Sequence, residues 1–81
     1  MDKLSYNYSK LRGRIVEKFG TLGEFSKAME WSERTNGLKL NGKVEWKQNE
    51  IMTAIGLLDI EPADIDIYFF NVKVQRIEQI I

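Results

Sequence analysis

The segment from Thr21 to Lys43 constrains the fold of this chain more than any other, because two helix starts lie in it eleven residues apart. Thr21 precedes Glu24 by three positions, which is the spacing of a capping box. In that motif the threonine hydroxyl accepts a hydrogen bond from the backbone N–H of the glutamate. The pairing predicts a helix that begins at Leu22 and ends at Met29.

A second helix is expected to begin directly after Ser32, which is a favourable N-cap residue. This helix should cover Glu33 to Leu40, because the pair Asn41-Gly42 supplies a left-handed stop after the last apolar residue. Two short helices joined by a tight turn are the sequence pattern of a helix-turn-helix motif.

The residue types that are missing exclude several kinds of chemistry. The 81 residues include no cysteine and no histidine, so disulfides, thiolate or imidazole metal sites and histidine-based catalytic triads are ruled out. We therefore expect a single domain that is not an enzyme and that uses no cofactor, metal or small-molecule substrate. The apolar runs are too short for a signal peptide or a membrane span, so we expect a soluble intracellular protein without a membrane partner.

The charges are distributed unevenly along the chain although their sum is zero. Residues 1–47 carry ten basic and six acidic side chains, a net charge of +4. Residues 48–81 carry two basic and six acidic side chains, a net charge of −4. The zero net charge by itself argues against a nucleic-acid partner, but the predicted helix-turn-helix lies in the basic half.

Three further helices are expected around this motif. Residues Met1 to Asn7 lack a clear period and should form a loose arm, and Ser9 is a candidate N-cap for the first helix. The fourth helix should begin near Lys47 or Gln48, and Pro62 suits the first turn of a short fifth helix. The side chains that these helices are expected to turn toward the core are Leu11, Ile15, Val16, Phe19, Ile51, Ala54, Ile55, Leu57, Leu58, Ile65, Tyr68, Phe69 and Phe70.

The segment from residue 71 to residue 81 fits two patterns. Val72 and Val74 alternate with polar residues as in a strand, whereas Val74, Ile77 and Ile80 recur as in a helix. Either way the segment is too apolar to remain solvated. It should either complete the core or pair with a second copy of the chain.

The predicted third helix has one face for the core and one for a partner. Trp31, Thr35 and Leu38 follow helical spacing and are expected to pack inward, which leaves Glu33, Asn36 and Gly37 on or near the outer side. Gly37 costs such a helix about 1 kcal/mol relative to alanine, a cost more easily tolerated where a backbone must approach something closely. The alternative is that Asn36-Gly37 is a poor helical pair or an early helix end.

The sequence also matches the local pattern of a known family, from Tyr6 to about Gln75. The matching motif residues are Phe25, Ser26, Trp31, Ser32, Thr35, Asn41 and Gly42, and the further matching segments are YNYSKLRGRIVEKFGT, KLNGKVEWKQNEI and IYFFNVKVQ. The chain resembles the compact five-helix, lambda-repressor-like DNA-binding domains, and within them the Cro and CI repressors of temperate bacteriophages. This likeness implies an all-α fold. It implies a helix-turn-helix DNA-binding domain over residues 1–70 and a tail over residues 71–81 that is a candidate dimerisation element.

Three positions depart from the family pattern. Glu30 stands where the family has a turn glycine, so a residue with a Cβ must adopt the left-handed conformation, at a cost of about 1 kcal/mol. Trp31 stands where the family has isoleucine or valine. Asn36 occupies a place that the family buries, whereas the helical spacing turns it outward. For Asn36 we expect partial burial with a hydrogen bond to a neighbouring backbone group.

The resemblance implies a sequence-specific transcriptional repressor that binds double-stranded operator DNA with the third helix in the major groove. Arg34 would bridge guanine O6 and N7, and Glu33 would accept from cytosine N4. Leu38 or Thr35 would touch a thymine methyl group, and Gly37 would let the helix sit deep. The base-contact candidates are Glu33, Arg34, Thr35, Gly37 and Leu38, and the phosphate-contact candidates are Lys10, Thr21, Leu22, Lys39, Asn41, Lys43, Trp46 and Lys47.

Some of these candidates have an alternative role. Lys10 and Lys47 also fit as ordinary solvated lysines, and Trp46 also fits as a cap on the core beneath its loop. A homodimer that reads half-sites about 34 Å apart fits better than a monomer, because one small module makes few phosphate contacts. Repression would be steric and would take place in the cytoplasm of a bacterial host. Length together with the resemblance favours a Cro-like protein over a full-length CI repressor.

Two other classes of protein are the alternatives to a repressor. A helix-turn-helix protein-interaction module, such as an antitoxin or an adaptor, would use Trp31, Trp46 and the tail on a protein partner. An enzyme is disfavoured, because the acidic cluster of the second half lacks the loop glycine and ligand order of a calcium site and instead suits the start of a helix. The members of that cluster are Asp59, Glu61, Asp64 and Asp66.

Overall fold

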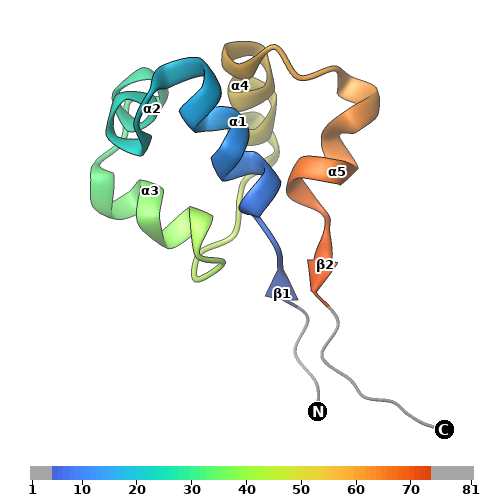
Figure 1. Cartoon of the computed structure of the whole chain (residues 1–81). Helices are drawn as coiled ribbons and strands as arrows, with labels where there is room; N and C mark the ends of the chain where they lie inside the picture. The colour runs from blue at the N-terminus through green and yellow to red at the C-terminus, as the bar shows by residue number, and fades with distance from the viewer. Residues whose placement is uncertain (1–4, 74–81) are drawn as a thin grey trace, which may run out of the picture.

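The computed structural model of the protein describes residues 5–73, which form five α-helices, one short 3-10 helix and one pair of strands (Figure 1). The elements in chain order are β1 (Ser5–Tyr6), α1 (Ser9–Phe19), α2 (Leu22–Met29), α3 (Glu33–Leu40), α4 (Gln48–Leu58), η1 (Pro62–Asp64), α5 (Ile65–Phe69) and β2 (Val72–Lys73). The expected all-α, five-helix fold is confirmed. None of the helices in the described range is long and apolar enough to cross a membrane.

The two helices of the central segment begin and end where their capping residues predict. Thr21 Oγ1 accepts a hydrogen bond from the N–H of Glu24 at 3.1 Å, and Ser32 Oγ accepts one from the N–H of Thr35 at 3.0 Å. Each bond satisfies a backbone donor that a helix start leaves without an intrahelical partner. The helix-turn-helix is therefore encoded locally.

The start of α1 differs by one residue from the prediction. Ser9 is the first residue of the helix and Tyr8 stands at the N-cap, while Asn7 Oδ1 accepts the N–H of Ser9 at 2.9 Å. The prediction of Ser9 as N-cap is therefore wrong, because an asparagine two residues earlier satisfies that donor. Helix α4 lacks a serine, threonine or aspartate cap, and the Glu50 carboxylate instead accepts the N–H of Lys47 at 2.8 Å.

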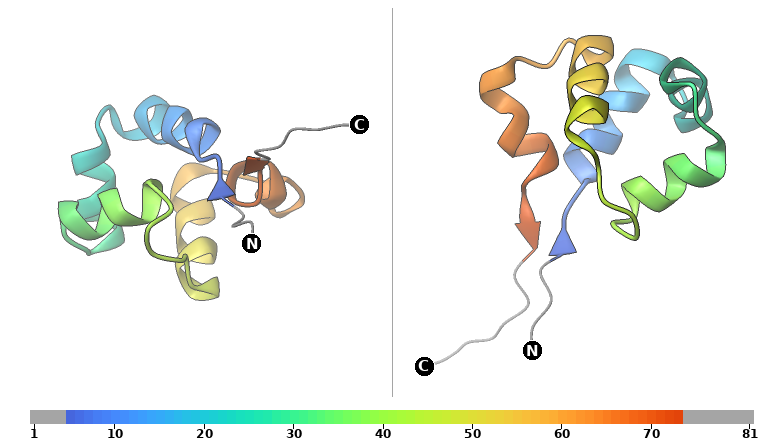
Figure 2. Two further views of the ribbon diagram at one scale, coloured as in Figure 1. Left: turned by 90° about the horizontal axis from the view of Figure 1, so that it is seen from below. Right: turned by 180° about the vertical axis from the view of Figure 1, so that it is seen from behind.

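The two ends of the described chain pair with each other. Tyr6 lies opposite Val72 and Ser5 opposite Lys73 in an antiparallel pair, so the end of the chain returns to its beginning (Figure 2). The prediction of a loose arm is wrong for Ser5 and Tyr6, and the rest of that arm, residues 1–4, lies outside the described residues. The strand pattern is confirmed for Val72 and Lys73. The helical alternative concerns residues 74–81, which lie outside the described range.

The core lies where α1, α2, α4 and α5 meet. The largest fully buried side chains are Leu11, Ile15, Phe25, Leu58 and Phe69. Two of the predicted core residues point outward instead, since Val16 and Phe70 are each 50% exposed. Val16 follows a buried isoleucine on α1, and Phe70 follows α5 at its C-cap, where the chain turns toward β2.

Candidate nucleic-acid interface

The turn between α2 and α3 sets the angle of the helix-turn-helix. Glu30 adopts the left-handed conformation, with φ 64° and ψ 38°, and the N–H of Trp31 donates to the carbonyl of Ser26 at 3.1 Å. The expected left-handed turn is confirmed at a residue that carries a Cβ. Such a conformation costs roughly 1–2 kcal/mol relative to glycine, so the turn stores strain that the packing around it must offset.

Asn36 is buried, and its side chain ties α3 to α2 and to the turn. Only 3% of the residue is exposed. Its Oδ1 accepts the indole N–H of Trp31 at 3.0 Å, and its Nδ2 donates to the carbonyl of Leu22 at 3.2 Å. The expected backbone hydrogen bond is confirmed, and the helical stripe that turned Asn36 outward is wrong. The amide is tolerated inside because both of its ends have partners.

The first turn of α3 is the part of that helix that faces solvent. Glu33 and Arg34 are exposed, whereas Thr35, Gly37 and Leu38 are half-buried. Within the described part of the chain no hydrogen bond or ion pair holds the Arg34 guanidinium. A Cβ at Gly37 would meet no atom within 4 Å, so open space lies beside this residue. The five base-contact candidates thus lie on one helix, and Arg34, the one cation among them, is exposed.

The Glu33 carboxylate lies beside the start of α2. Its Oε2 is 2.9 Å from the position that a Cβ on Gly23 would occupy, so the absence of that Cβ makes room for it. A negative charge is favourable near a helix N-terminus. The same charge opposes a DNA phosphate at Thr21 and Leu22, which were predicted to bind one.

Most of the other phosphate candidates are accessible, since Lys10, Thr21, Asn41, Lys43 and Lys47 are exposed and Leu22 is half-buried. Asn41 is not free, because its Oδ1 accepts a hydrogen bond from Nη2 of Arg12. Arg12 also donates to the carbonyl of Leu40 at 3.4 Å. The sequence patterns did not predict that Arg12 would hold the end of α3, although Arg12 lies on the polar side of α1 in the basic half of the chain.

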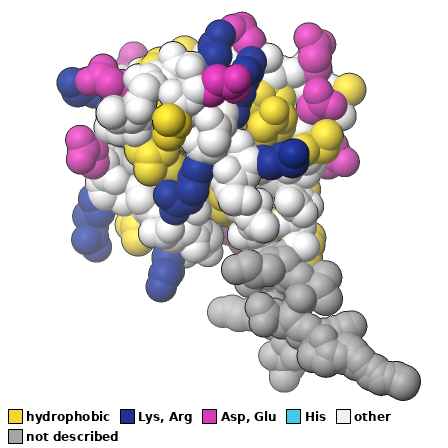
Figure 3. Space-filling model, in the orientation of Figure 1, with side chains coloured by type: hydrophobic (Ala, Val, Ile, Leu, Met, Phe, Trp, Pro, Cys, Tyr) yellow, Lys and Arg dark blue, Asp and Glu magenta, His cyan; other side chains and the backbone are white. Residues whose placement is uncertain are grey.

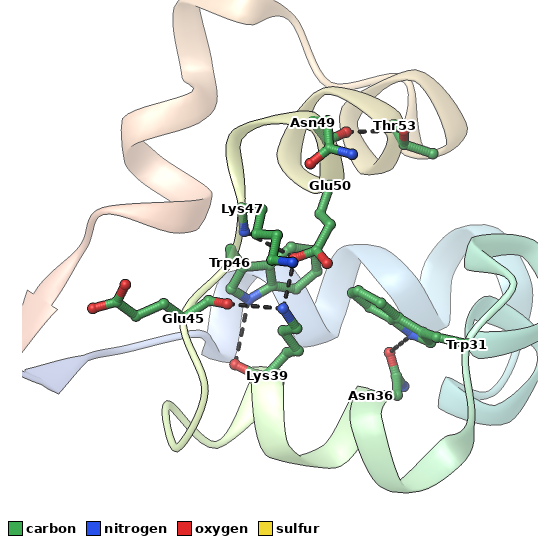
Figure 4. A network of polar contacts seen from close by, with 9 residues as sticks. All are labelled: Trp31, Asn36, Lys39, Glu45, Trp46, Lys47, Asn49, Glu50 and Thr53. Atoms are coloured by element: carbon green, nitrogen blue, oxygen red, sulfur yellow. Dashed lines mark hydrogen bonds and ion pairs between the residues drawn. The ribbon is translucent and has the colours of Figure 1, made fainter.

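Lys39 and Trp46 are placed differently from their predicted role in phosphate binding. Lys39 is buried, and its ammonium donates to Oε1 of Glu50 at 2.6 Å and to the carbonyl of Glu45 at 2.8 Å (Figure 4). A cation held in this way is not available to a phosphate, so we correct that assignment. Trp46 packs against the core, with its ring 5.0 Å from that of Phe69, and its indole N–H donates to the carbonyl of Lys39 at 3.3 Å. The alternative role of Trp46 as a cap on the core fits this geometry.

The groups around the Glu50 carboxyl lower its pKa. Partial burial by itself raises its pKa. Hydrogen bonds from the Lys39 ammonium and the Lys47 N–H, together with the charges of both lysines, outweigh the burial, so the pKa of Glu50 lies below its ordinary value. The group is therefore ionised at neutral pH and pairs with Lys39 as a carboxylate.

The charge asymmetry of the sequence is also visible on the surface. In Figure 3 basic side chains project at the lower left, where α3 lies in Figure 1, and acidic side chains stand at the upper right, near α5, while both signs are mixed across the top and the left edge. In the range 5–73 no group of three or more acidic side chains is arranged so as to hold a metal ion. Arg34 in α3 and Lys43 in the turn that follows it are both exposed.

The α2–turn–α3 unit, with its exposed first turn and its buried asparagine, defines a small helix-turn-helix protein. The chain belongs to the family described as "Protein of unknown function (DUF739)", which matches residues 4–72. It is similar to the modulator of repression (MOR) of the temperate bacteriophage TP901-1 from Lactococcus lactis, whose solution structure shares 55% sequence identity with it. That alignment has a TM-score of 0.74 and covers 83% of this chain and 90% of the phage protein. A comparison with curated protein sequences gave no significant match.

Proposed function

We propose that this protein is a regulator of phage transcription that binds double-stranded operator DNA with α3 in the major groove. The observation that carries the proposal is the exposure of Arg34 in the first turn of α3, with its guanidinium held by no other group in the described part of the chain. The first residues of a recognition helix are those that meet base edges, and arginine is the commonest reader of guanine. The likeness to a phage modulator of repression supports a regulatory role.

The other contacts divide between base edges and the DNA backbone. Thr35 and Leu38 are half-buried, so they touch a thymine methyl group only with the edge that remains exposed. Lys10, Lys43 and Lys47 supply the phosphate contacts and set the register of the helix without reading sequence. Glu33 lies beside α2 and therefore weakens binding at the start of that helix more than it contributes a base contact.

The mode of action that fits this interface is steric and dimeric. A Cro-like homodimer covers an operator that overlaps a promoter, in the cytoplasm of the bacterial host, and excludes the polymerase. Two copies are needed because a single module with so few free cations neutralises few phosphates. The zero net charge predicts a shallow salt dependence and weak non-specific binding.

A protein partner is the second candidate, and a specific observation favours it. Three exposed acids, Glu24, Glu30 and Glu33, surround the start of α2 and the turn, where a DNA backbone would pass. The similar phage protein is described as a modulator of repression and not as a repressor. In this alternative the helix-turn-helix binds a basic protein surface and changes repression indirectly.

Selection of bound sequences from a random duplex pool, followed by titration of the selected duplex, separates the two candidates. The Arg34→Ala variant should bind the selected duplex about 1–3 kcal/mol more weakly and should lose preference at one base pair. Lys18→Ala is the matched control, because Lys18 bonds Asp59 at 2.6 Å and lies away from α3 while the change in charge is the same. Failure to select any sequence at low salt, or equal binding by wild type and Arg34→Ala, would reject DNA binding through α3.

A further inference from the structure

The last turn of α3 carries a buried charge that the proposed DNA contacts do not use. The Lys39 side chain is 5% exposed and that of Glu50 20% exposed, with 2.6 Å between Nζ and Oε1. The ammonium also donates to the carbonyl of Glu45 and lies 5.5 Å from the centre of the Trp31 ring. The ammonium thus has a carboxylate, a backbone carbonyl and an aromatic ring among its neighbours.

These contacts join three segments that follow one another in the chain. Lys39 belongs to α3, Glu45 and Trp46 to the loop after it, and Glu50 to the first turn of α4 (Figure 4). The Glu50 carboxylate accepts hydrogen bonds from the N–H of Lys47 and from the Lys39 ammonium. The indole N–H of Trp46 donates to the carbonyl of Lys39. The path of the loop is thus fixed at both ends by the same ion pair.

The loop in question carries accessible groups of the proposed interface. Lys43 is exposed in it, and the N–H groups of Lys43 and Val44 donate to the carbonyl of Leu38 at 2.9 and 3.3 Å. Any movement of the loop relative to α3 changes the distance between Lys43 and the exposed Arg34. Lys43 can bind a DNA phosphate while Arg34 contacts a base edge only when the distance between the two side chains lies in a narrow range.

A charged pair differs from an apolar one in what it contributes. Removing Lys39 almost fully and Glu50 partly from water offsets much of their attraction, and replacing a buried pair by apolar side chains of similar volume is often neutral or stabilising. The pair instead makes the position of the loop specific, because its directional hydrogen bonds are satisfied in only one arrangement of the loop. Apolar side chains would fill the same space in several arrangements.

We propose that Lys39 and Glu50 are positioning residues that hold the loop of residues 41–47 against α3, in the one arrangement that lets both engage DNA. The inference rests on the proposed function, because it assigns the pair a role in that interface and not in folding alone. Its consequence is that affinity for DNA and stability respond differently to loss of the pair.

The test compares the wild type with Lys39→Met/Glu50→Met, which replaces the pair by apolar side chains of similar length. The exposed pair Lys18–Asp59 provides the matched control, Lys18→Met/Asp59→Asn, which makes the same change of charge on another surface. We expect the buried double variant to unfold at no lower urea concentration than the wild type and yet to bind the selected duplex about tenfold more weakly. The control should match the wild type in both assays. A buried double variant that is stable and binds with wild-type affinity would overturn the proposal.

A pH profile gives a readout that loss of stability alone would not produce. The charged groups that face the Glu50 carboxylate are Lys39 from α3 and Lys47 at the start of α4. As pH falls and Glu50 becomes protonated, the folded wild type should lose affinity for the duplex, and the buried double variant should show no such loss. Parallel profiles for the two proteins would contradict the role of the pair.

Hydrogen exchange tests the same inference without DNA. At equal global stability the amides of Lys43 and Val44 and the indole N–H of Trp46 should exchange at least about tenfold faster in the buried double variant, because loop opening no longer breaks an ion pair. Unchanged exchange would overturn the inference. Should the wild type bind no duplex at all, the proposed function would fail on that result, and the exchange rates would still decide whether the pair holds the loop.

Discussion

Replacing Asn36 by alanine should destabilise the protein by about 2–3 kcal/mol. The side chain makes two buried hydrogen bonds, to the Trp31 indole and to the Leu22 carbonyl, and each contributes about 0.5–1.5 kcal/mol net. Removing the amide from a site that is 3% exposed also leaves a small void, which adds to the loss. For a domain of this size the expected fall in melting temperature is roughly 10–20 °C.

Urea unfolding followed by circular dichroism would measure this loss. Asn49→Ala is the matched control, because Asn49 is exposed in the first turn of α4 and its replacement should change stability by no more than about 0.5 kcal/mol. Asn36→Asp isolates one of the two bonds, since a carboxylate still accepts from Trp31 but cannot donate to Leu22. Its buried charge should make it less stable than Asn36→Ala at neutral pH. If Asn36→Ala and Asn49→Ala unfolded at the same urea concentration, Asn36 would not be the link between α2 and α3.

Two further changes probe strain and charge. Glu30→Gly should raise the free energy of unfolding by about 0.5–1 kcal/mol in the same urea assay. Glycine relieves the left-handed strain, and the greater freedom of glycine in the unfolded chain cancels part of that gain. A loss of stability would show that the Glu30 side chain makes a compensating contact. Glu50 has a folded pKa below its ordinary value of 4.5, so its contribution to stability is complete above its unfolded pKa and disappears as pH falls through the folded pKa. Glu50→Gln should therefore be less stable than the wild type at pH 7 and should lose less stability on acidification, and identical acid profiles would contradict the ion pair.

The parts of the fold that were predicted correctly are those whose causes lie within a few residues. Thr21 with Glu24, and Ser32 with Thr35, are neighbours along the chain, and their hydrogen bonds set the starts of α2 and α3. The pairing of Tyr6 with Val72 joins residues from opposite ends of the described range and has no local pattern. Phe70 is apolar yet half exposed, because the turn toward β2 and not its hydropathy decides where it points.

The candidate site was predicted less completely, for a different physical reason. Lys39 is a basic residue in a short helix, and such residues are usually solvated, so a surface role was the natural prediction. Its burial depends on a carboxylate eleven residues further along the chain, on a loop carbonyl and on an aromatic ring, none of which a helical period can place. Asn36 is buried where its amide bonds both the Trp31 indole and the Leu22 carbonyl, two groups that the helical period of α3 does not place. Arg34 was predicted from its place in the first turn of α3, and its exposure agrees with that place.

The most direct test of DNA binding through α3 is a map of backbone amide shifts during titration with the selected duplex. We expect the largest changes at Glu33, Arg34 and Thr35, smaller changes in the loop around Lys43, and almost none in η1 and α5. A scrambled duplex at the same salt concentration should leave the α3 amides unshifted. Shifts confined to the acidic side of the molecule, or equal shifts with both duplexes, would contradict recognition of DNA by this helix.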